Sequence, residues 1–418
     1  MPKFVIDQDF STEYKIVSSA KTWVFTQGIE GESATEQVIH EQQGVADSHI
    51  IINAHLDNDG DIGILAEGDK TELTIGKAGW IDAYHAVKMT GLQQSIVNNG
   101  LVTGENIGIL ANGAGTHIVN NGTIGGMIPI AANSAGLVVE NNGMLQGMYG
   151  MIVEGEGAKI LLGEKSFISA HHTAVEFHGH DGEHMRLVNR GYMAASEDRA
   201  ITALGSDNTV INRGEMRGAV SFGDGDDVFD TRGGKFVGTV YGADGDDTYV
   251  TDTAKLHIFE SDDRGTDTVK STVSIDFTKG TFATEYLENI VLIGKADTNA
   301  TGNDQYNSLT GNAGDNRLDG NEGIDFLRGG KGNDLLIGGT GTDFFAFKTG
   351  DGHDVIQDFS VGLEQIDISG WKAIKDFDDL MAHHLHKDGA DLVITAGSDS
   401  LRLEDFKLGD LEATDFQY

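Results

Sequence analysis

The sequence predicts an all-β protein, with an N-terminal parallel β-solenoid (β-helix) that continues into a parallel β-roll and a small mixed C-terminal cap. A repeat of about 21 residues predicts the solenoid, and an uninterrupted nine-residue repeat predicts the roll. The chain also contains 58 Gly but only 2 Pro and no Cys. Glycine without proline indicates many tight turns rather than a disordered linker, and no disulfide can hold the fold together.

The longer repeat is a short β-branched run that ends in Asn and Gly. Its first four copies are 21, 22 and 21 residues apart and end at Gly79, Gly100, Gly122 and Gly143. A strand, a turn and a return of this length make one coil of a parallel solenoid. We therefore expect Ile96 to stack on Ile118, and Asn98 on Asn120, from coil to coil. Unrelated short strands in a β-sandwich are the alternative.

The shorter repeat fills residues 302–346 with five nonapeptides. Position 1 is always Gly, and position 8 is always large and apolar. Position 6 is Asn or Asp, namely Asn307, Asn316, Asp325, Asp334 and Asp343. Such a unit divides into a six-residue turn and a three-residue strand. Because unit n stacks on unit n+2, position-6 carboxylates 18 residues apart would lie about 4.7 to 4.9 Å from each other.

Charge indicates what could hold such turns together. The 66 acidic and 29 basic residues give a net charge of −37, which excludes a nucleic-acid binder. Neighbouring carboxylates repel each other unless a cation lies between them. Ca²⁺ takes six to eight oxygen ligands, which suits paired Asp side chains and turn carbonyls. The sequence also has no apolar run long enough for a membrane span, and its N-terminus lacks the pattern of a cleavable signal peptide.

These nonapeptides resemble the RTX (repeats-in-toxin) family, whose motif is G-G-x-G-x-D-x-U-x with U apolar. The resemblance implies several bound Ca²⁺ ions. It implies one site from Asn321, Gly323, Asp325, Gly338, Thr340 and Asp343. It implies a second from Gly330, Gly332, Asp334, Thr349, Asp351 and Asp354, with the later loop offset by two residues. Asn307 and Asn316 stand where the motif has Asp, so those turns should bind weakly or not at all.

Three acidic units at wider spacing precede the uninterrupted block, around Asp227, Asp247 and Asp267. Carried onto them, the motif predicts a further site from Gly223, Gly225, Asp227, Gly242, Asp244 and Asp247. Solvated acidic turns without a metal are the alternative. The expected domains are a cap with the first strands (1–69), the β-helix (70–220), the calcium-binding β-roll (221–346) and a C-terminal cap with a secretion signal (347–418).

The resemblance implies an extracellular protein, exported by type I secretion machinery and folding when Ca²⁺ binds outside the cell. A structural, adhesive or matrix role at the cell surface fits best, with polysaccharide or a second copy of the chain as partner. The alternative is a polysaccharide lyase or epimerase that uses the β-helix. Such enzymes need clustered carboxylates or a Tyr/His pair. The sequence shows no such constellation at the coil spacing, so no catalytic residue is assigned.

One histidine-rich segment lengthens its coil, because Gly163 and Gly191 are 28 residues apart. A transition-metal site is one interpretation of it, and a solvated loop is the other. Its candidate ligands are His171, His172, His178, His180, Asp181, Glu183 and His184.

Overall fold

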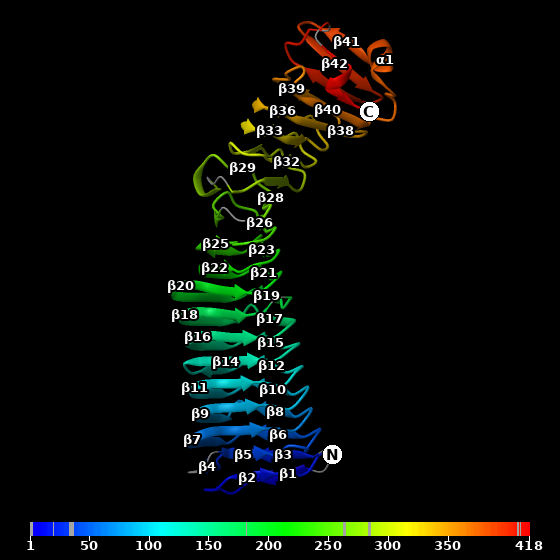
Figure 1. Cartoon of the computed structure of the whole chain (residues 1–418). Coiled ribbons are helices and arrows are strands. Elements are labelled where there is room, and N and C mark those ends of the chain that lie inside the picture. The colour runs from blue at the N-terminus through cyan, green and yellow to red at the C-terminus, as the bar shows by residue number, and fades with distance from the viewer. Residues whose placement is uncertain are drawn as a thin grey trace. The chain divides into compact units, whose positions relative to one another are not determined.

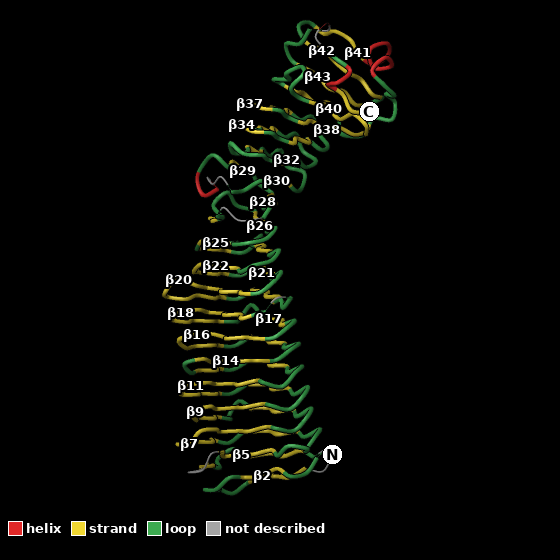
Figure 2. Tube along the Cα trace, in the orientation of Figure 1, coloured by secondary structure: helices red, strands yellow, loops and turns green. Residues whose placement is uncertain are grey.

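The computed structural model describes residues 3–19, 21–32, 37–180, 182–261, 265–282, 286–407, 409 and 411–418. Strands dominate the described chain, which forms two compact units, Met1–Asp244 and Gly245–Tyr418. Each unit is built from short strands joined by turns (Figures 1 and 2).

The first unit is a parallel β-solenoid with two stacked sheets. Consecutive strands of sheet A pair in parallel, and these are β1 (Lys3–Ile6), β3 (Thr22–Phe25), β6 (His49–Ile52), β8 (Glu72–Ile75), β10 (Ser95–Asn98), β12 (His117–Asn120), β15 (Val138–Asn141), β17 (Ala158–Leu162), β19 (Met185–Asn189), β21 (Thr209–Asn212) and β23 (Val228–Asp230). Figure 1 shows them as successive layers from blue to green.

Sheet B lies across the coil from sheet A, and its strands also pair in parallel. Its strands are β2 (Tyr14–Ile16), β5 (Gln37–Glu41), β7 (His55–Ala66), β9 (Trp80–Met89), β11 (Leu101–Ala111), β13 (Thr123–Gly125), β14 (Ile128–Asn133), β16 (Met144–Glu154), β18 (Phe167–His178), β20 (Tyr192–Leu204), β22 (Glu215–Phe222), β24 (Lys235–Val237) and β25 (Thr239–Tyr241), with β4 (Glu30–Glu32) beside β7. Parallel pairing throughout this unit confirms the solenoid and excludes the β-sandwich.

The interior of the first unit contains the expected stacks. Ile96 pairs in register with Ile118, and both side chains are fully buried. The buried amide of Asn98 donates from Nδ2 to Oδ1 of Asn120 at 2.9 Å, and Asn120 donates likewise to Asn141 at 2.7 Å. An amide both donates and accepts, so identical Asn side chains satisfy one another as the coils repeat.

The described residues between 3 and 69 contribute strands to the same two sheets, and the cap expected there stays a prediction. Thr22–Phe25 pairs with His49–Ile52, and His49–Ile52 pairs with Glu72–Ile75. The aromatic side chain of Phe25 is fully buried. These coils lack the Asn-Gly ending of the later ones, so the sequence repeat does not reveal them. The two compact units meet between Asp244 and Gly245, and the expected domain boundaries stay predictions.

The second unit is also built largely from stacked parallel strands. Its sheet C contains β26 (Thr248–Thr251), β28 (Thr268–Ser271), β30 (Asn289–Leu292), β32 (Ser308–Thr310), β35 (Phe326–Arg328), β38 (Phe344–Lys348), β40 (Gln365–Gly370) and β44 (Phe416–Gln417). Its sheet D contains β29 (Ile275–Asp276), β31 (Ala300–Thr301), β33 (Arg317–Asp319), β36 (Leu335–Ile337), β39 (His353–Ile356), β43 (Asp399–Leu403), β42 (Asp391–Ala396) and β41 (Leu385–Asp388).

Smaller elements complete the second unit. The last three strands of sheet D include an antiparallel hairpin, β42 with β43, and β41 extends it antiparallel. The remaining elements are β27 (His257–Phe259), β34 (Glu322–Gly323), β37 (Thr340–Gly341), η1 (Gly280–Phe282), α1 (Phe377–Asp379), η2 (Leu380–His384) and η4 (Ala413–Asp415). Position-8 side chains of the nonapeptides, including Leu327 and Leu336, are fully buried between the sheets. The predicted roll with a mixed cap is confirmed.

Among the described residues, the structure contains no helix with the length and apolarity needed to cross a membrane.

Candidate calcium sites

The turns of the nonapeptides stack on one another two units apart, as the repeat predicts. Glu322 pairs with Thr340 and Gly323 with Gly341. The N–H of Thr340 donates to the carbonyl of Asn321 at 2.9 Å. This stacking brings together the loops that carry the first predicted ligand set.

Two glycines make the close approach possible. Gly341 has a φ of +142°, and a Cβ there would overlap the carbonyl oxygen of Gly323 in the loop beneath. A Cβ at Gly338 would lie 2.5 Å from Oδ2 of Asp343. Glycine at position 1 therefore leaves room for the position-6 carboxylate, and glycine at position 4 lets the loops approach each other.

The position-6 carboxylates of these loops lie one above the other. The N–H of Asp325 donates to Oδ1 of Asp343 at 2.9 Å, and both side chains are fully buried. Oδ2 of each is buried and has no hydrogen-bond partner among the described residues. Burial raises the pKa of Asp325 to about 8, and burial also raises the pKa of Asp343. Ionising both side chains at neutral pH therefore costs free energy in this fold unless a cation is close.

The opposite side of the roll repeats this arrangement. The N–H of Asp334 donates to Oδ1 of Asp354 at 2.9 Å, and the N–H of Gly332 donates to the carbonyl of Asp351 at 2.8 Å. Oδ2 of Asp334 and Oδ1 of Asp351 are buried without a hydrogen-bond partner among the described residues. Burial raises the pKa of Asp334 and that of Asp354 to about 7 each.

Two other residues of the second predicted calcium site, Thr349 and Gly330, have no buried carboxylate, and the structure places them differently. Thr349 is exposed, and its N–H and hydroxyl donate to the carbonyl of Gly370 at 3.3 and 3.1 Å. Gly330 has a φ of +98°, and a Cβ there would lie 2.5 Å from the carbonyl oxygen of Asn312. The two-residue offset thus brings Asp351 and Asp354 next to Asp334, and leaves Thr349 at the surface.

The turns with Asn at position 6 have no comparable orphan atoms. Nδ2 of Asn316 donates to the carbonyl of Thr298 at 2.8 Å. Nδ2 of Asn307 donates to the carbonyls of Leu287 and Glu288 at 3.2 and 3.1 Å. The amide hydrogens satisfy backbone oxygens of the neighbouring loop, and weak or absent calcium binding at these turns stays a prediction.

The upstream set, predicted from Gly223 to Asp247, is divided by the boundary between the units. In the first unit, the N–H of Gly225 donates to the carbonyl of Asp244 at 2.8 Å, and Asp227 is buried. Gly223 lies close to Gly205 of the preceding coil, whereas Gly242 is buried and Asp244 is exposed. The pairing of these residues with Asp247 stays a prediction.

In the second unit, Asp247 belongs to a buried acidic cluster that the sequence only partly indicated. Carboxylate oxygens of Asp247, Glu260 and Asp267 lie within 4.8 Å of one another. The hydroxyl of Tyr249 donates to Glu260 and to Oδ2 of Asp247, the latter at 3.3 Å. Burial raises the pKa of Tyr249 well above its usual value, so the phenol remains a hydrogen-bond donor. Glu260 was missed because it lies outside the repeat register.

Three acidic residues beyond the nonapeptides also face the roll. Glu364 precedes Gln365, which pairs with Phe344, so Glu364 follows Asp343 in the stack. Burial raises the pKa of Glu364 to about 8. Asp358 accepts from the N–H groups of Gly338 and Gly339 at 3.0 and 2.8 Å, and Asp399 accepts from that of Gly350 at 2.8 Å. The spacing of 21 residues from Asp343 to Glu364 was the one signal available in the sequence.

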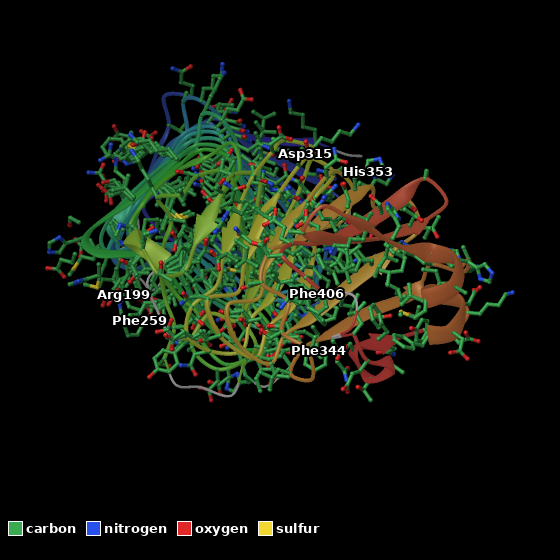
Figure 3. All side chains as sticks on the ribbon, turned by 90° about the horizontal axis from the view of Figure 1, so that it is seen from above. Arg199, Phe259, Asp315, Phe344, His353 and Phe406 are labelled. Atoms are coloured by element: carbon green, nitrogen blue, oxygen red, sulfur yellow. The ribbon has the colours of Figure 1, made fainter. Side chains whose placement is uncertain are left out.

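Position 5 of the repeats contrasts with position 6, because it forms a polar ladder at the surface. Oδ1 of Asp315 accepts from the N–H of Asn333 at 2.8 Å, and Oδ1 of Asn333 accepts from that of His353 at 3.2 Å. Figure 3 shows Asp315 and His353 along one edge of the second unit. Exposed carboxylates at position 5 are hydrated, so only the buried row at position 6 needs a counter-charge.

The buried row fits calcium. Its donors are carboxylate and carbonyl oxygens, the hard ligands that Ca²⁺ prefers over nitrogen or sulfur. Three of its Asp side chains, Asp325, Asp334 and Asp343, keep a buried oxygen that no described group satisfies, and so does Asp351 at position 3 of its turn. A bound calcium ion supplies the positive charge that lets such carboxylates ionise inside the fold.

Comparison with known proteins supports this chemistry. Residues 310–345 and 319–356 match the RTX calcium-binding nonapeptide repeat. The segment is therefore an RTX-type calcium-binding repeat, and the predicted resemblance and calcium are confirmed for it. No curated protein matches the chain.

One solved structure with a detectable likeness is the extracellular lipase LipA from Serratia marcescens, at 16% identity and a TM-score of 0.24. The alignment covers 54% of this chain, which spans 45% of the lipase. A likeness this weak carries no argument about fold or activity.

The first unit contains an acidic hollow that the sequence did not reveal. It measures about 430 Å³ and is lined by Asp57, Asn58, Gly60, Asp61, Asp82, Ala83, Tyr84 and Glu105. Asp57 pairs in register with Asp82. Burial, with smaller contributions from Asp57 and Glu105, raises the pKa of Asp82. Asp57, Asp82 and Glu105 therefore share one hollow, although the sequence shows no such group at the regular coil spacing. The spacings of 25 and 23 residues between Asp57, Asp82 and Glu105 differ from the regular coil, because β-bulges add residues.

The histidine-rich segment does not form a single cluster among its described residues. His178 contacts Glu176 at 2.8 Å, and His180 contacts Glu183 at 3.4 Å. His171 and His172 instead contact Glu197, from the next coil. Asp181 lies outside the described residues.

Proposed function

We propose that this chain is a secreted calcium-binding protein with a structural, adhesive or matrix role at the cell surface, and that its roll folds on export when Ca²⁺ binds. The observation that carries the proposal is that the buried position-6 carboxylates of Asp325, Asp334 and Asp343 each keep one oxygen without a hydrogen-bond partner among the described residues. The proposed ligands are the three sets predicted from the sequence. Further acidic groups are Glu364, which follows Asp343 on one side of the roll, and Asp399, which lies beside the Gly350 turn on the opposite side.

Calcium would then act as a compartment switch. In the low calcium of a cytosol, the buried carboxylates oppose folding at neutral pH and keep the roll in a form that type I secretion machinery can thread. In extracellular calcium the sites fill. One site at 100 times its Kd contributes about 2.7 kcal/mol, and several linked sites reach the net stability of a typical domain.

An adhesive role is supported by a column of side chains on the outer face of sheet B. Trp80 pairs with Leu101, and farther along Met144 pairs with Phe167 and Phe167 with Tyr192. Trp80 and Phe167 are 39% and 41% exposed. Phe167 and Tyr192 stack with ring centroids 5.0 Å apart. The exposed edges of these stacked rings form an apolar column that suits contact with an extended polysaccharide. The net charge of −37 favours a neutral one.

The calcium proposal is tested on the full chain by titrating Ca²⁺ into calcium-depleted protein, with circular dichroism and light scattering recorded together. We expect β-structure to rise with calcium to a plateau, and light scattering would show whether self-association accompanies folding. Full β-structure in excess chelator at neutral pH would refute it.

Polysaccharide contact is tested by electrophoresis through gels containing a soluble neutral glucan. Retardation should weaken in Phe167→Ala and Tyr192→Ala, and unretarded wild type would reject the adhesive part alone.

A polysaccharide-modifying enzyme is the second candidate, and the acidic hollow around Asp82 favours it. Carboxylates beside Tyr84 could abstract and return a proton at a sugar ring. The test is incubation with uronate-containing polysaccharides while absorbance from newly formed double bonds is followed. A lyase would raise the absorbance, and Asp82→Asn or Tyr84→Phe would abolish the rise. No change in absorbance or product composition would reject this candidate.

A further inference from the structure

A β-bulge in the first unit brings two adjacent histidines together on one surface. Neighbouring residues of a regular strand point to opposite faces. The register between β18 and β20 shifts between Ala170 and Thr173, where the pairing resumes with Arg199. His171 and His172 lie within this bulge, and both side chains contact Glu197. Figure 3 shows Arg199 at the outer edge of the first unit, where the bulge meets solvent.

The three side chains converge on one point. Nε2 of His171 lies 3.1 Å from Oε1 of Glu197, and Nδ1 of His172 contacts Oε2. One ligand atom from each residue falls within 4.8 Å of the other two. Zinc binds nitrogen and oxygen at about 2.0 to 2.2 Å, so two ligands of a tetrahedral ion lie roughly 3.4 Å apart. The spacing of this cluster suits a shared ion.

Ser196 favours the tautomer of His171 that has its proton on Nδ1 and its lone pair on Nε2, the nitrogen that faces Glu197. Its hydroxyl donates to the carbonyl of His171 at 3.1 Å, so its oxygen is left to accept from Nδ1 of His171 at 2.8 Å. In the neutral imidazole, a proton on Nδ1 leaves the lone pair on Nε2. That lone pair faces a carboxylate oxygen, and two acceptors at this distance need a proton or a metal cation between them. Histidines that ligate metals commonly donate their other N–H in this way.

We propose that His171, His172 and Glu197 bind a divalent transition-metal ion of the zinc type, distinct from the calcium sites. Imidazole nitrogen is a ligand for zinc, copper and nickel, whereas calcium takes oxygen. The site would join two successive coils and leave a coordination position open to solvent. The His117–Glu140 pair, at 3.2 Å on the same unit, has one imidazole for its carboxylate and provides a matched control.

The test is calorimetric titration of Zn²⁺ into the calcium-saturated full chain, without a histidine tag, together with the visible absorbance of bound Co²⁺. We expect one zinc equivalent per chain, weakened at least about tenfold by His171→Ala, His172→Ala or Glu197→Gln, and unchanged by His117→Ala. Thermal melts would establish that each variant folds. Binding that is absent from the wild type, or unaffected by all three substitutions in folded protein, would overturn the proposal.

Discussion

The buried polar side chains of the two units stack in the same parallel register but differ in chemistry. In the first unit, Asn98 and Asn120 satisfy each other through their amides. In the second, Asp325 and Asp343 share one hydrogen bond and keep two buried oxygens without partners among the described residues. An amide is both donor and acceptor, whereas a carboxylate only accepts. Replacing a buried amide by a carboxylate therefore turns a stack whose side chains satisfy one another's hydrogen bonds into one that needs a proton or a cation.

Asn307 and Asn316 show the same difference within the roll itself. Their amides donate to carbonyls of the neighbouring loop, where the Asp-bearing turns have no donor. The backbone geometry is therefore compatible with either side chain, and the side chain decides whether the turn depends on calcium.

Removing calcium should destabilise the second unit much more than the first. At neutral pH, we expect chelator to unfold the nonapeptide region while the amide-stacked coils persist, because the roll buries a row of Asp carboxylates where the coils of residues 95–143 bury Asn amides. Hydrogen exchange measured by mass spectrometry would show protection lost over residues 302–356 and retained over residues 95–143. Equal loss in both regions, or in neither, would contradict the contrast.

Replacing the buried Asp side chains by Asn should remove the dependence of these turns on calcium. Asp325→Asn with Asp343→Asn should weaken calcium binding by at least about tenfold, because two charged ligands are lost. The same variant should hold more β-structure than wild type in chelator, since its amides can donate as Asn316 does. Calorimetry and circular dichroism measure the two effects. Asp315→Asn, at the exposed position 5, is the control and should change neither.

Acid should partly replace calcium. The folded pKa values of about 8 for Asp325 and about 7 for Asp334 lie above the ordinary value near 4. The calcium-free fold therefore binds extra protons, and its stability falls as pH rises from about 4 to about 8. In calcium-depleted protein, β-structure should increase as pH is lowered across this range, while calcium affinity should decrease. A pH-independent signal in both experiments would show that these carboxylates are not buried in solution.

Cutting the amide ladder should destabilise the first unit without changing calcium binding. Asn120→Ala leaves the Asn98 amide donor and the Asn141 acceptor buried without their partner, at a cost of about 1 to 3 kcal/mol. Asn121→Ala removes an exposed ladder bond to Asn99 of 3.0 Å and should cost less than about 0.5 kcal/mol. Thermal unfolding of both variants in calcium gives the comparison, and equal losses would show that burial does not matter here.

Much of this fold can be predicted from the sequence because regularly stacked coils place their turn residues at regular intervals along the chain. Gly100 and Gly122 mark their coils, and the nonapeptide glycines mark the turns around Asp325 and Asp334. The first coils, around Phe25, pair in the same parallel register but lack the Asn-Gly motif, so they are recognised from the structure and not from the sequence repeat.

The remaining site residues depend on departures from regularity. Asp399 reaches Gly350 through a hairpin 49 residues further along the chain. Glu197 meets His171 and His172 because a bulge turns two neighbours to one side. Bulges likewise displace Asp82 from the regular coil spacing. A single sequence records repeats directly, but it does not record where an extra residue changes which side chains face each other.

The central claim is that a cation, rather than a proton or water, completes the buried carboxylate row at neutral pH. The most direct measurement is an anomalous-difference map from a crystal of the full chain grown in calcium at neutral pH. The account predicts a calcium peak between the stacked turns of Asp325 and Asp343, and none at Asn316. A peak only at exposed carboxylates, or water between the two buried ones, would contradict it.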